Sequence, residues 1–418
     1  MFQVSREFAP PFSLISPFFV AGSLFYLAAM LLLPMLGVDS SSYDMGVVAW
    51  AHLFLLGFVM MIIFGAMAQL VPVVLEVGHF SVDFYYLIWP LLAAGTLLMA
   101  TGFAFLPGIL PYGGLMVLTA MLIFLADTIL TLRKVEHVSL TVKTVGVTNA
   151  FLLLGILVGF AMALAIGAGV GVDIEKWLGA HIVLVLGGYV TMTIIGMSMV
   201  LLPMFGLSHG FDETPVNRSF KIMSCGVFAY FIGALFDSDS IRFLSMVAIF
   251  IATGLYLWQI WLIYKTRARR ESDIWFRSMV VGYGSLAFAL LLAPFALIGR
   301  LESLALASAW FLVMGFFAFL INGHLFKIVP FLVWFERYSP LVGKEKVPML
   351  ADMIPKKRAD FQFWFSTAGV IMGGLGLLIG SDEIFRGGAA FMAVGAVFMF
   401  ISVRWMINFG KSDNSEGK

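Results

Sequence analysis

Twelve long apolar runs constrain this chain more than any other feature of its sequence. A helix needs about 20 mostly apolar residues to cross the ~30 Å hydrocarbon layer of a membrane. The runs cover residues 12–37, 46–75, 85–106, 109–132, 145–170, 177–207, 220–236, 241–264, 275–299, 304–330, 361–379 and 384–408. Only 12% of the residues are charged, about half the ~25% of soluble domains. The sequence therefore predicts an all-α polytopic membrane protein with twelve transmembrane helices, and excludes a soluble enzyme and a nucleic-acid-binding protein.

The positive charges predict how the chain is oriented. If the N-terminus is cytoplasmic, the outer side holds four of the 25 Lys and Arg residues, namely Lys176, Arg242, Arg300 and Arg386. The other 21 lie on the inner side, most densely within 265–270 and 344–358. Because positively charged loops stay in the cytoplasm, we expect both termini in the cytoplasm. The expected location is a prokaryotic plasma (inner) membrane.

No stretch of the sequence is typical of a soluble domain. The longest polar stretch, 336–360, is too short to form a domain core. We therefore predict a single twelve-helix membrane domain over residues 1–418, with a short polar tail at 411–418. The first run follows Arg6 and Glu7 without a small-residue cleavage site, which indicates an uncleaved span. One cysteine, Cys225, excludes an intrachain disulfide and a cysteine-based metal site.

Three of the runs share an anchor, in which a glycine is followed seven residues later by a proline. The anchors are Gly65 with Pro72, Gly196 with Pro203, and Gly323 with Pro330. The first two extend upstream to the matching segments Gly57-Phe-Val and Gly188-Tyr-Val. Glycine and proline are common in membrane helices for close packing and kinks. Their recurrence at every fourth run nevertheless predicts three pseudo-equivalent four-helix units.

Histidines within the runs are candidate cofactor ligands, since ionisable groups inside a bilayer are rare and often functional. His52 lies six residues into its run and His181 lies four residues into its own. Both runs descend from the outer surface, so the two imidazoles lie at similar depths of roughly 6–9 Å. Two neutral imidazoles at one level suit the bis-His iron of a b-type haem. The alternative is that each histidine bonds a backbone carbonyl or a water.

A second polar group stands near the inner end of the 304–330 run, where Asn322, His324 and Lys327 follow one another closely. His324 lies roughly 20 Å deeper than His52 by helical rise, so the two cannot ligate one iron. The residue in register with His52 is Trp310. The group predicts an inner polar or metal site that includes His324, or only marks the membrane interface.

His79 and His209 follow the first two anchor prolines at the inner ends of their runs, near Glu76 and Asp212. A histidine–carboxylate group suits zinc, so a weak second metal site is one interpretation. The favoured alternative is that both are solvated loop residues, as is His137. The other polar residues within the runs form no file of carboxylates, which argues against a proton pump; they are Gln69, Asp127, Asn149 and Gln259.

The segment His52-Leu-Phe-Leu-Leu-Gly-Phe58, followed by Gly65 and Pro72, resembles a known motif. It is similar to the haem-binding second-helix region of haem–copper oxidase subunit I-like proteins and to the corresponding stretch of NnrS-type membrane proteins. Those families have twelve helices in three four-helix arcs. The resemblance implies a haem near the outer face, with an arginine between the last two helices at its propionates. Arg386 matches that position, and Lys176 and Arg300 are outer-side alternatives.

The sequence departs from the oxidase pattern in three places. The 220–236 run has no histidine, the 304–330 run lacks the family's His-x-His, and His181 is not followed by Pro-Glu-Val-Tyr. The copper and oxygen-reducing centre therefore cannot be assembled, which argues against copper and against a functional terminal oxidase. The family also places its haem between the second and tenth helices, whereas the depth argument favours the second and sixth. Covalent c-type attachment is excluded because C-x-x-C-H is absent.

The sequence thus predicts a haem b-binding membrane protein related to haem–copper oxidase subunit I, with one haem per chain held by His52 and His181. Electron transfer is expected if both histidines ligate the iron, and binding of a gas molecule if only one does. The rival hypothesis is a cofactor-free transporter that uses Asn322, His324 and Lys327. A homodimer or a role as a subunit of a respiratory complex stays open, and the electron donor is not specified.

Overall fold

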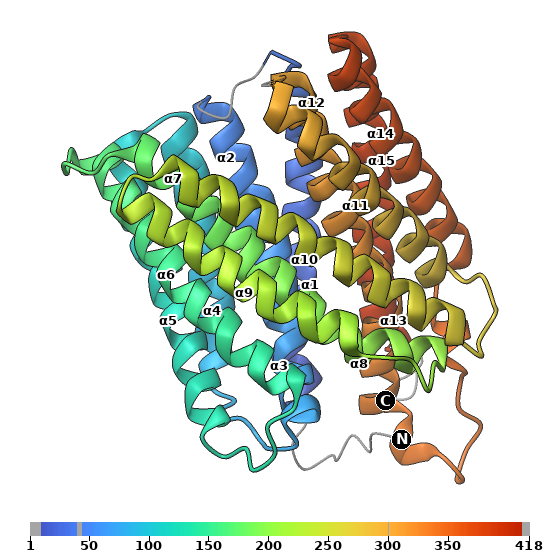
Figure 1. Ribbon diagram of the computed structural model, residues 1–418. Helices are drawn as coiled ribbons and strands as arrows, with labels where there is room; N and C mark the ends of the chain where they lie inside the picture. The colour runs from blue at the N-terminus through green and yellow to red at the C-terminus, as the bar shows by residue number, and fades with distance from the viewer. Residues whose placement is uncertain (1–9, 40–43, 300, 412–418) are drawn as a thin grey trace. The chain divides into compact units, whose positions relative to one another are not determined.

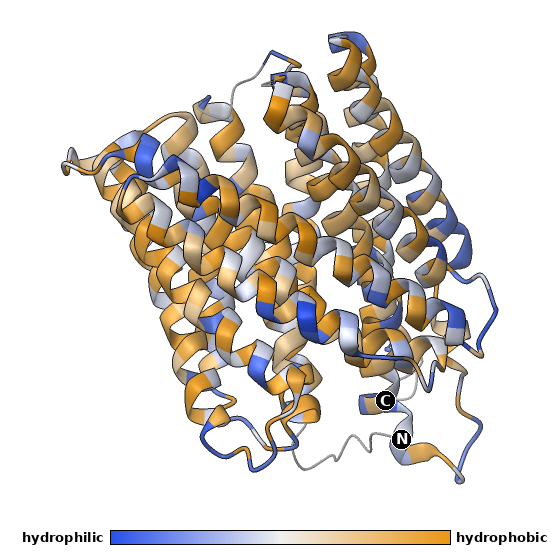
Figure 2. Ribbon diagram, in the orientation of Figure 1, coloured by the Kyte–Doolittle hydropathy of each residue, from blue (hydrophilic) through white to orange (hydrophobic). Residues whose placement is uncertain are grey.

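A computed structural model describes residues 10–39, 44–299 and 301–411 of the chain. These residues form twelve helical rods and contain no β-strand. Eleven of the rods are long and apolar enough to cross a membrane. Figure 2 shows mostly apolar residues along the rods and hydrophilic residues gathered at their connections. The prediction of an all-α polytopic membrane protein in contact with the lipid bilayer is confirmed.

The helices follow the predicted runs closely. Their bounds are α1 Phe12–Leu32, α2 Met45–Phe54, α3 Met61–Leu75, α4 Phe84–Ala104, α5 Leu110–Leu132, α6 Leu140–Ala168, α7 Ile174–Ile182, α8 Met192–Gly206, α9 Thr214–Leu235, α10 Asp239–Thr266, α11 Ile274–Gly299, α12 Glu302–Trp310, α13 Ala318–Arg337, α14 Lys356–Ile379 and α15 Asp382–Asn408. The regularity follows from the membrane, where a helix satisfies every backbone hydrogen bond within its own segment.

Three rods change their winding part-way along. π-helical segments Leu55–Met60, Val183–Thr191 and Phe311–Phe317 join α2 to α3, α7 to α8 and α12 to α13. The resulting continuous rods are Met45–Leu75, Ile174–Gly206 and Glu302–Arg337. These are the three rods that carry the glycine–proline anchors, so the sequence repeat coincides with a repeat in backbone conformation.

One predicted span has a weaker apolar character than the others. Helix α9 forms as expected, but it is not among the eleven rods that meet the length and hydropathy requirements. Its first turns contain Arg218 and Lys221. The tenth rod, by contrast, is longer than predicted, because its helix continues through Pro330 to Arg337.

The described chain divides into two compact units. Unit 1 contains residues 69–271 and holds α4 to α10. Unit 2 contains residues 10–68 and 272–411 and holds α1, α2 and α11 to α15. The unit boundary at Ala68 and Gln69 falls within α3. The predicted single domain over 1–418 stays a prediction.

The glycine anchors pack against the preceding helix in one repeated register. In the first rod, Gly57 faces Phe25 of α1 and Gly65 faces Phe18. In the second, Gly188 faces Phe151 of α6 and Gly196 faces Thr144. In the third, Gly315 faces Ser285 of α11 and Gly323 faces Ser278. In every pair the glycines are eight residues apart and their partners seven. A Cβ on Gly57 would lie 2.5 Å from the Phe25 ring, and one on Gly188 would lie 2.8 Å from Phe151 Cβ. The glycines therefore allow the two helices of each pair to approach closely, and the same packing occurs in all three pairs.

Helices α14 and α15 form another close pair in unit 2 and run side by side in Figure 1. Gly388 of α15 lies against the α14 backbone. A Cβ built on it would lie 2.8 Å from both the Gly369 carbonyl oxygen and Gly373 Cα. The neighbouring Gly387 is less crowded, because a Cβ there would meet only the end of the Met372 side chain at 3.3 Å.

Candidate functional site

The imidazole of His52 is held by its own helix. Its Nδ1 lies 2.8 Å from the carbonyl oxygen of Val48, one turn earlier in α2. Because a carbonyl only accepts hydrogen bonds, Nδ1 carries the proton, and in the neutral ring Nε2 has the lone pair. Histidines that ligate metals are commonly oriented by this kind of hydrogen bond. The half-buried His52 stands three residues before the π-helical segment Leu55–Met60.

His181 is held in the same way, but by a neighbouring helix. Its Nδ1 lies 2.9 Å from the carbonyl oxygen of Gly155 in α6. The ring packs over Gly159, where a Cβ would lie 2.6 Å from His181 Cε1. The π-helical segment Val183–Thr191 begins two residues later. The backbone-carbonyl bond considered in the sequence analysis is therefore present at both histidines, and it gives both rings the same tautomer when neutral.

The position of His181 is also part of the threefold repeat. Seven residues before Gly57, Gly188 and Gly315 stand Trp50, His181 and Ser308. Each of these side chains donates a hydrogen bond to a backbone carbonyl oxygen of the preceding helix. Trp50 Nε1 donates to Ala29 at 2.9 Å and His181 Nδ1 to Gly155 at 2.9 Å. Ser308 Oγ donates to Ala289 at 3.0 Å. His181 thus joins two helices in addition to any other role. His52 belongs to unit 2 and His181 to unit 1, and their joint ligation of one iron stays a prediction.

Two of the cations predicted near the outer side, Arg386 and Lys176, have protein partners. Arg386 pairs with Asp382 one turn earlier in α15, at 3.2 Å, and its side chain is 54% exposed. Lys176 donates to the carbonyl oxygen of Leu235 at the end of α9, at 3.2 Å, and so caps that helix. Arg300 lies outside the described residues. Of the two described cations, Arg386 is the more exposed.

The polar group of α13 does not converge on one point. Lys327 pairs with Asp273 at 2.6 Å. His324 bonds the Leu320 carbonyl through Nδ1 at 2.7 Å, and its ring meets Trp275 of α11 edge-on, with ring centroids 6.1 Å apart. Asn322 instead lies beside Tyr26 of α1. The three residues proposed for a transporter site therefore contact different neighbours.

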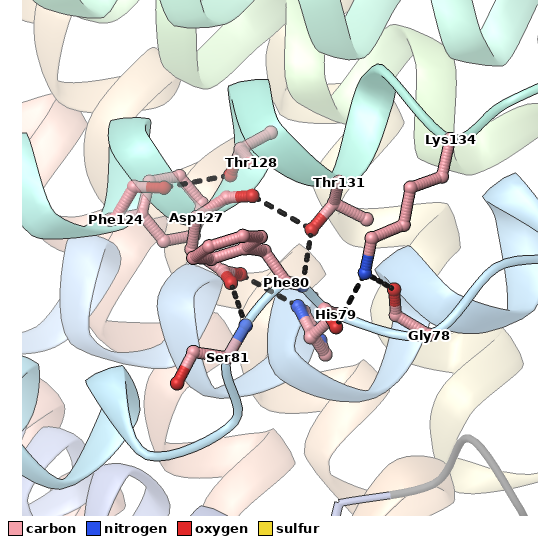
Figure 3. A network of polar contacts seen from close by, with 9 residues as sticks. All are labelled: Gly78, His79, Phe80, Ser81, Phe124, Asp127, Thr128, Thr131 and Lys134. Carbon is pink, nitrogen blue, oxygen red and sulfur yellow. Dashed lines mark hydrogen bonds and ion pairs between the residues drawn. The ribbon is translucent and has the colours of Figure 1, made fainter.

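His79 is buried rather than solvated, so the favoured interpretation from the sequence is wrong for this residue. Its side chain is fully buried, and Nδ1 lies 2.7 Å from Asp127 Oδ2 in α5. Figure 3 shows the surrounding network, in which Asp127 Oδ1 accepts from Ser81 N at 2.9 Å and Thr131 Oγ1 accepts from Phe80 N at 2.9 Å. The buried carboxylate explains the burial, because a charge in an apolar environment needs a hydrogen-bonded partner.

Lys134 closes the same network from the end of α5. Its Nζ donates to the carbonyl oxygens of His79 at 3.2 Å and Gly78 at 3.4 Å (Figure 3). The connection between α3 and α4 is thus fastened to α5 by backbone and side-chain bonds. The sequence contained one signal for this contact, because His79 and Asp127 are expected near the inner ends of the second and fourth spans.

The other loop histidines, His209 and His137, are exposed. Near His209, Asp212 accepts from both the amide and the hydroxyl of Thr214 at 2.9 and 2.6 Å. The Thr214 hydroxyl, followed by its amide, lowers the pKa of Asp212. Among the described residues, no group of three or more His, Cys, Asp and Glu side chains is placed to hold a metal ion. The weak zinc site suggested by His79 and His209 stays a prediction.

Comparison with known proteins adds no relative. No family model matches the sequence, and no curated protein matches it significantly. The resemblance to haem–copper oxidase subunit I-like and NnrS-type proteins depends on the residues around His52 and on the repeated anchors. It stays a prediction from those residues.

Proposed function

We propose that the protein is an integral membrane protein that binds one haem b per chain, with His52 and His181 as axial ligands. The supporting observation is that each imidazole makes the same kind of hydrogen bond, in which Nδ1 donates to a backbone carbonyl. Such a bond fixes the ring and leaves the Nε2 lone pair as the metal-binding group of a neutral imidazole. The donor set is also the one that suits haem iron.

The backbone next to both histidines supports the same proposal. A π-helical segment begins three residues after His52 and two after His181. Such segments in α-helices occur frequently at functional sites. Arg386 is the proposed partner of a propionate.

Bound haem would supply one-electron chemistry. The role of this chain is then to hold the iron and to decide whether a ligand position stays open. Ligation by both His52 and His181 favours electron transfer, whereas ligation by one leaves a position for a gas molecule. We propose a prokaryotic plasma membrane location with both termini in the cytoplasm, where 21 of the 25 Lys and Arg residues are expected. A homodimer or a respiratory complex is the proposed setting.

The test is a dithionite-reduced minus oxidised absorption spectrum of purified protein, with a pyridine haemochrome assay and iron, copper and zinc counts. We expect a sharp reduced α band and one iron per chain. His52→Ala removes or shifts this band, and His137→Ala is the matched control because His137 is exposed in a loop. Protein without haem, expressed with ample haem supply, contradicts the proposal.

His181 needs a variant that separates ligation from helix packing. Ser308 occupies the equivalent position and bonds the preceding helix through its hydroxyl. His181→Ser therefore retains a hydroxyl for the Gly155 carbonyl while it removes the imidazole. Loss of the band in a variant that elutes and melts like the parent protein supports ligation. An unchanged spectrum assigns His181 to helix packing alone.

The cofactor-free transporter is the less favoured proposal. Its three residues contact different neighbours, and the charge of Lys327 is already paired with Asp273. The absence of haem together with loss of uptake in His324→Ala would favour it over the haem proposal.

A further inference from the structure

Four polar side chains meet in the buried interior of unit 2. Tyr26 comes from α1, Asn322 from α13, and Gln362 and Ser366 from α14, and none is more than 1% exposed. The Tyr26 hydroxyl faces the side chains of Asn322 and Ser366. Gln362 Nε2 donates to Ser366 Oγ at 3.2 Å. Three helices that are distant in sequence thus bring polar groups to one place, which we call the Tyr26 cluster.

Most of the polar atoms in the Tyr26 cluster lack a hydrogen bond of ordinary geometry. They are the Tyr26 hydroxyl, the amide oxygen and nitrogen of Asn322, and Oε1 of Gln362. Buried polar groups in native proteins are hydrogen-bonded in the large majority of cases. Where the protein provides no partner, a buried water commonly does. A group of four such atoms therefore points to a bound molecule.

The repeated scaffold does not require polar residues at these positions. Asn322 stands seven residues after Gly315, and Tyr26 follows the residue that faces Gly57. The equivalent positions in the other helix pairs hold buried apolar residues. Phe64 and Ile195 stand at the position equivalent to Asn322, and Leu152 and Leu286 at the position equivalent to Tyr26. The polarity is thus particular to unit 2 and is not a consequence of helix packing.

We propose that the Tyr26 cluster binds ordered water. The orphan atoms include donors, from Tyr26 and the Asn322 amide nitrogen, and acceptors, from Asn322 and Gln362. A cation would face the donors unfavourably, and an anion would face the acceptors unfavourably. None of the four residues is charged, so neither ion would be neutralised. Water both donates and accepts, and one buried molecule makes two to four hydrogen bonds. The proposal is independent of haem binding.

X-ray radiolytic footprinting tests this directly, because radicals made from a bound water label the side chain beside it. The control is Tyr256, which is equally buried but donates to Ser198 Oγ at 3.1 Å. We expect Tyr26 to be labelled several-fold faster than Tyr256. We also expect Asn322→Leu to slow the labelling of Tyr26 toward the rate of Tyr256. Equal labelling of the two tyrosines in the parent protein overturns the proposal.

A second variant and a comparison of salts complete the test. Gln362→Met removes an acceptor with little change in volume, and it takes the place of Asn322→Leu if that variant does not fold. Labelling in sodium, potassium and choline chloride then distinguishes the ligand. Equal rates in the three salts support water, whereas protection by one small cation overturns water in favour of that ion.

Discussion

The buried pair of His79 and Asp127 allows a quantitative prediction. Asp127→Ala removes the carboxylate that lies 2.7 Å from His79 Nδ1 and accepts from Ser81 N at 2.9 Å. Breaking a buried pair by removing one partner typically costs about 3–5 kcal/mol of folding free energy. Asp127→Asn keeps an acceptor for Ser81 N but loses the charge-assisted bond, so we expect a smaller loss of about 1.5–3 kcal/mol.

The assay is reversible unfolding in mixed detergent–SDS micelles, followed by circular dichroism. Asp83→Ala is the matched control, since Asp83 precedes α4, is exposed and makes no side-chain cap. Its loss is expected to be at most about 1 kcal/mol, from the helix dipole. Hydrogen exchange locates the effect, because amides of 78–81 should exchange faster in Asp127→Ala than in Asp83→Ala.

A double-mutant cycle decides whether the pair is the cause. If His79 and Asp127 stabilise the fold through each other, His79→Ala combined with Asp127→Ala should cost less than the sum of the two single changes. Additive costs, or an Asp127→Ala loss no larger than that of Asp83→Ala, would refute the reasoning.

Two predictions concern other parts of the chain. Gly388→Ala should destabilise the protein by about 1–3 kcal/mol, because its Cβ meets the α14 backbone, whereas Gly387→Ala should be neutral or stabilising in the same unfolding assay. Thr214→Val should raise the pKa of Asp212 toward its ordinary value in an NMR titration, since the hydroxyl that lowers this pKa is lost. Any stability from the lowered pKa is present at neutral pH and is lost as the pH falls through it. The stability difference between the parent and Thr214→Val should therefore be largest at neutral pH and vanish in acid, and an unchanged titration would contradict the assignment.

The sequence predicted the helices well because the membrane couples hydropathy to backbone structure. Each apolar run became a helical rod, since a helix satisfies its backbone hydrogen bonds internally. The departures have local causes. Helix α9 contains Arg218 and Lys221, and Pro330 lies within a rod that continues to Arg337. Hydropathy alone therefore places the spans but does not fix their ends.

The glycine–proline anchors predicted a repeat, and the structure extends it. Gly315 stands eight residues before Gly323, just as Gly57 and Gly188 precede their anchor glycines. The third segment is less similar in sequence, because Phe317 stands where the other two segments have Val59 and Val190. Only the contacts with α1, α6 and α11 establish that all three glycines have the same packing role.

The candidate sites were predicted less completely than the fold. The sequence identified His52 and His181 as unusual, but the carbonyl that orients each ring became known only from the structure. His79 was treated as a loop residue because the residues near it are polar. Its partner Asp127 is 48 residues away, and a hydropathy pattern does not specify such a pairing.

Hydropathy and residue spacing establish that the chain spans a membrane as helices, and where its rare ionisable residues and its glycines fall along them. These are properties of single segments, governed by the transfer of side chains and backbone to lipid. The tertiary structure alone decided that His79 meets Asp127, that Asn322 turns toward Tyr26 while His324 turns toward Trp275, and that Lys327 is paired with Asp273. These partnerships depend on how each helix is rotated and shifted against its neighbours. That choice is set by close packing across elements, which no single segment specifies.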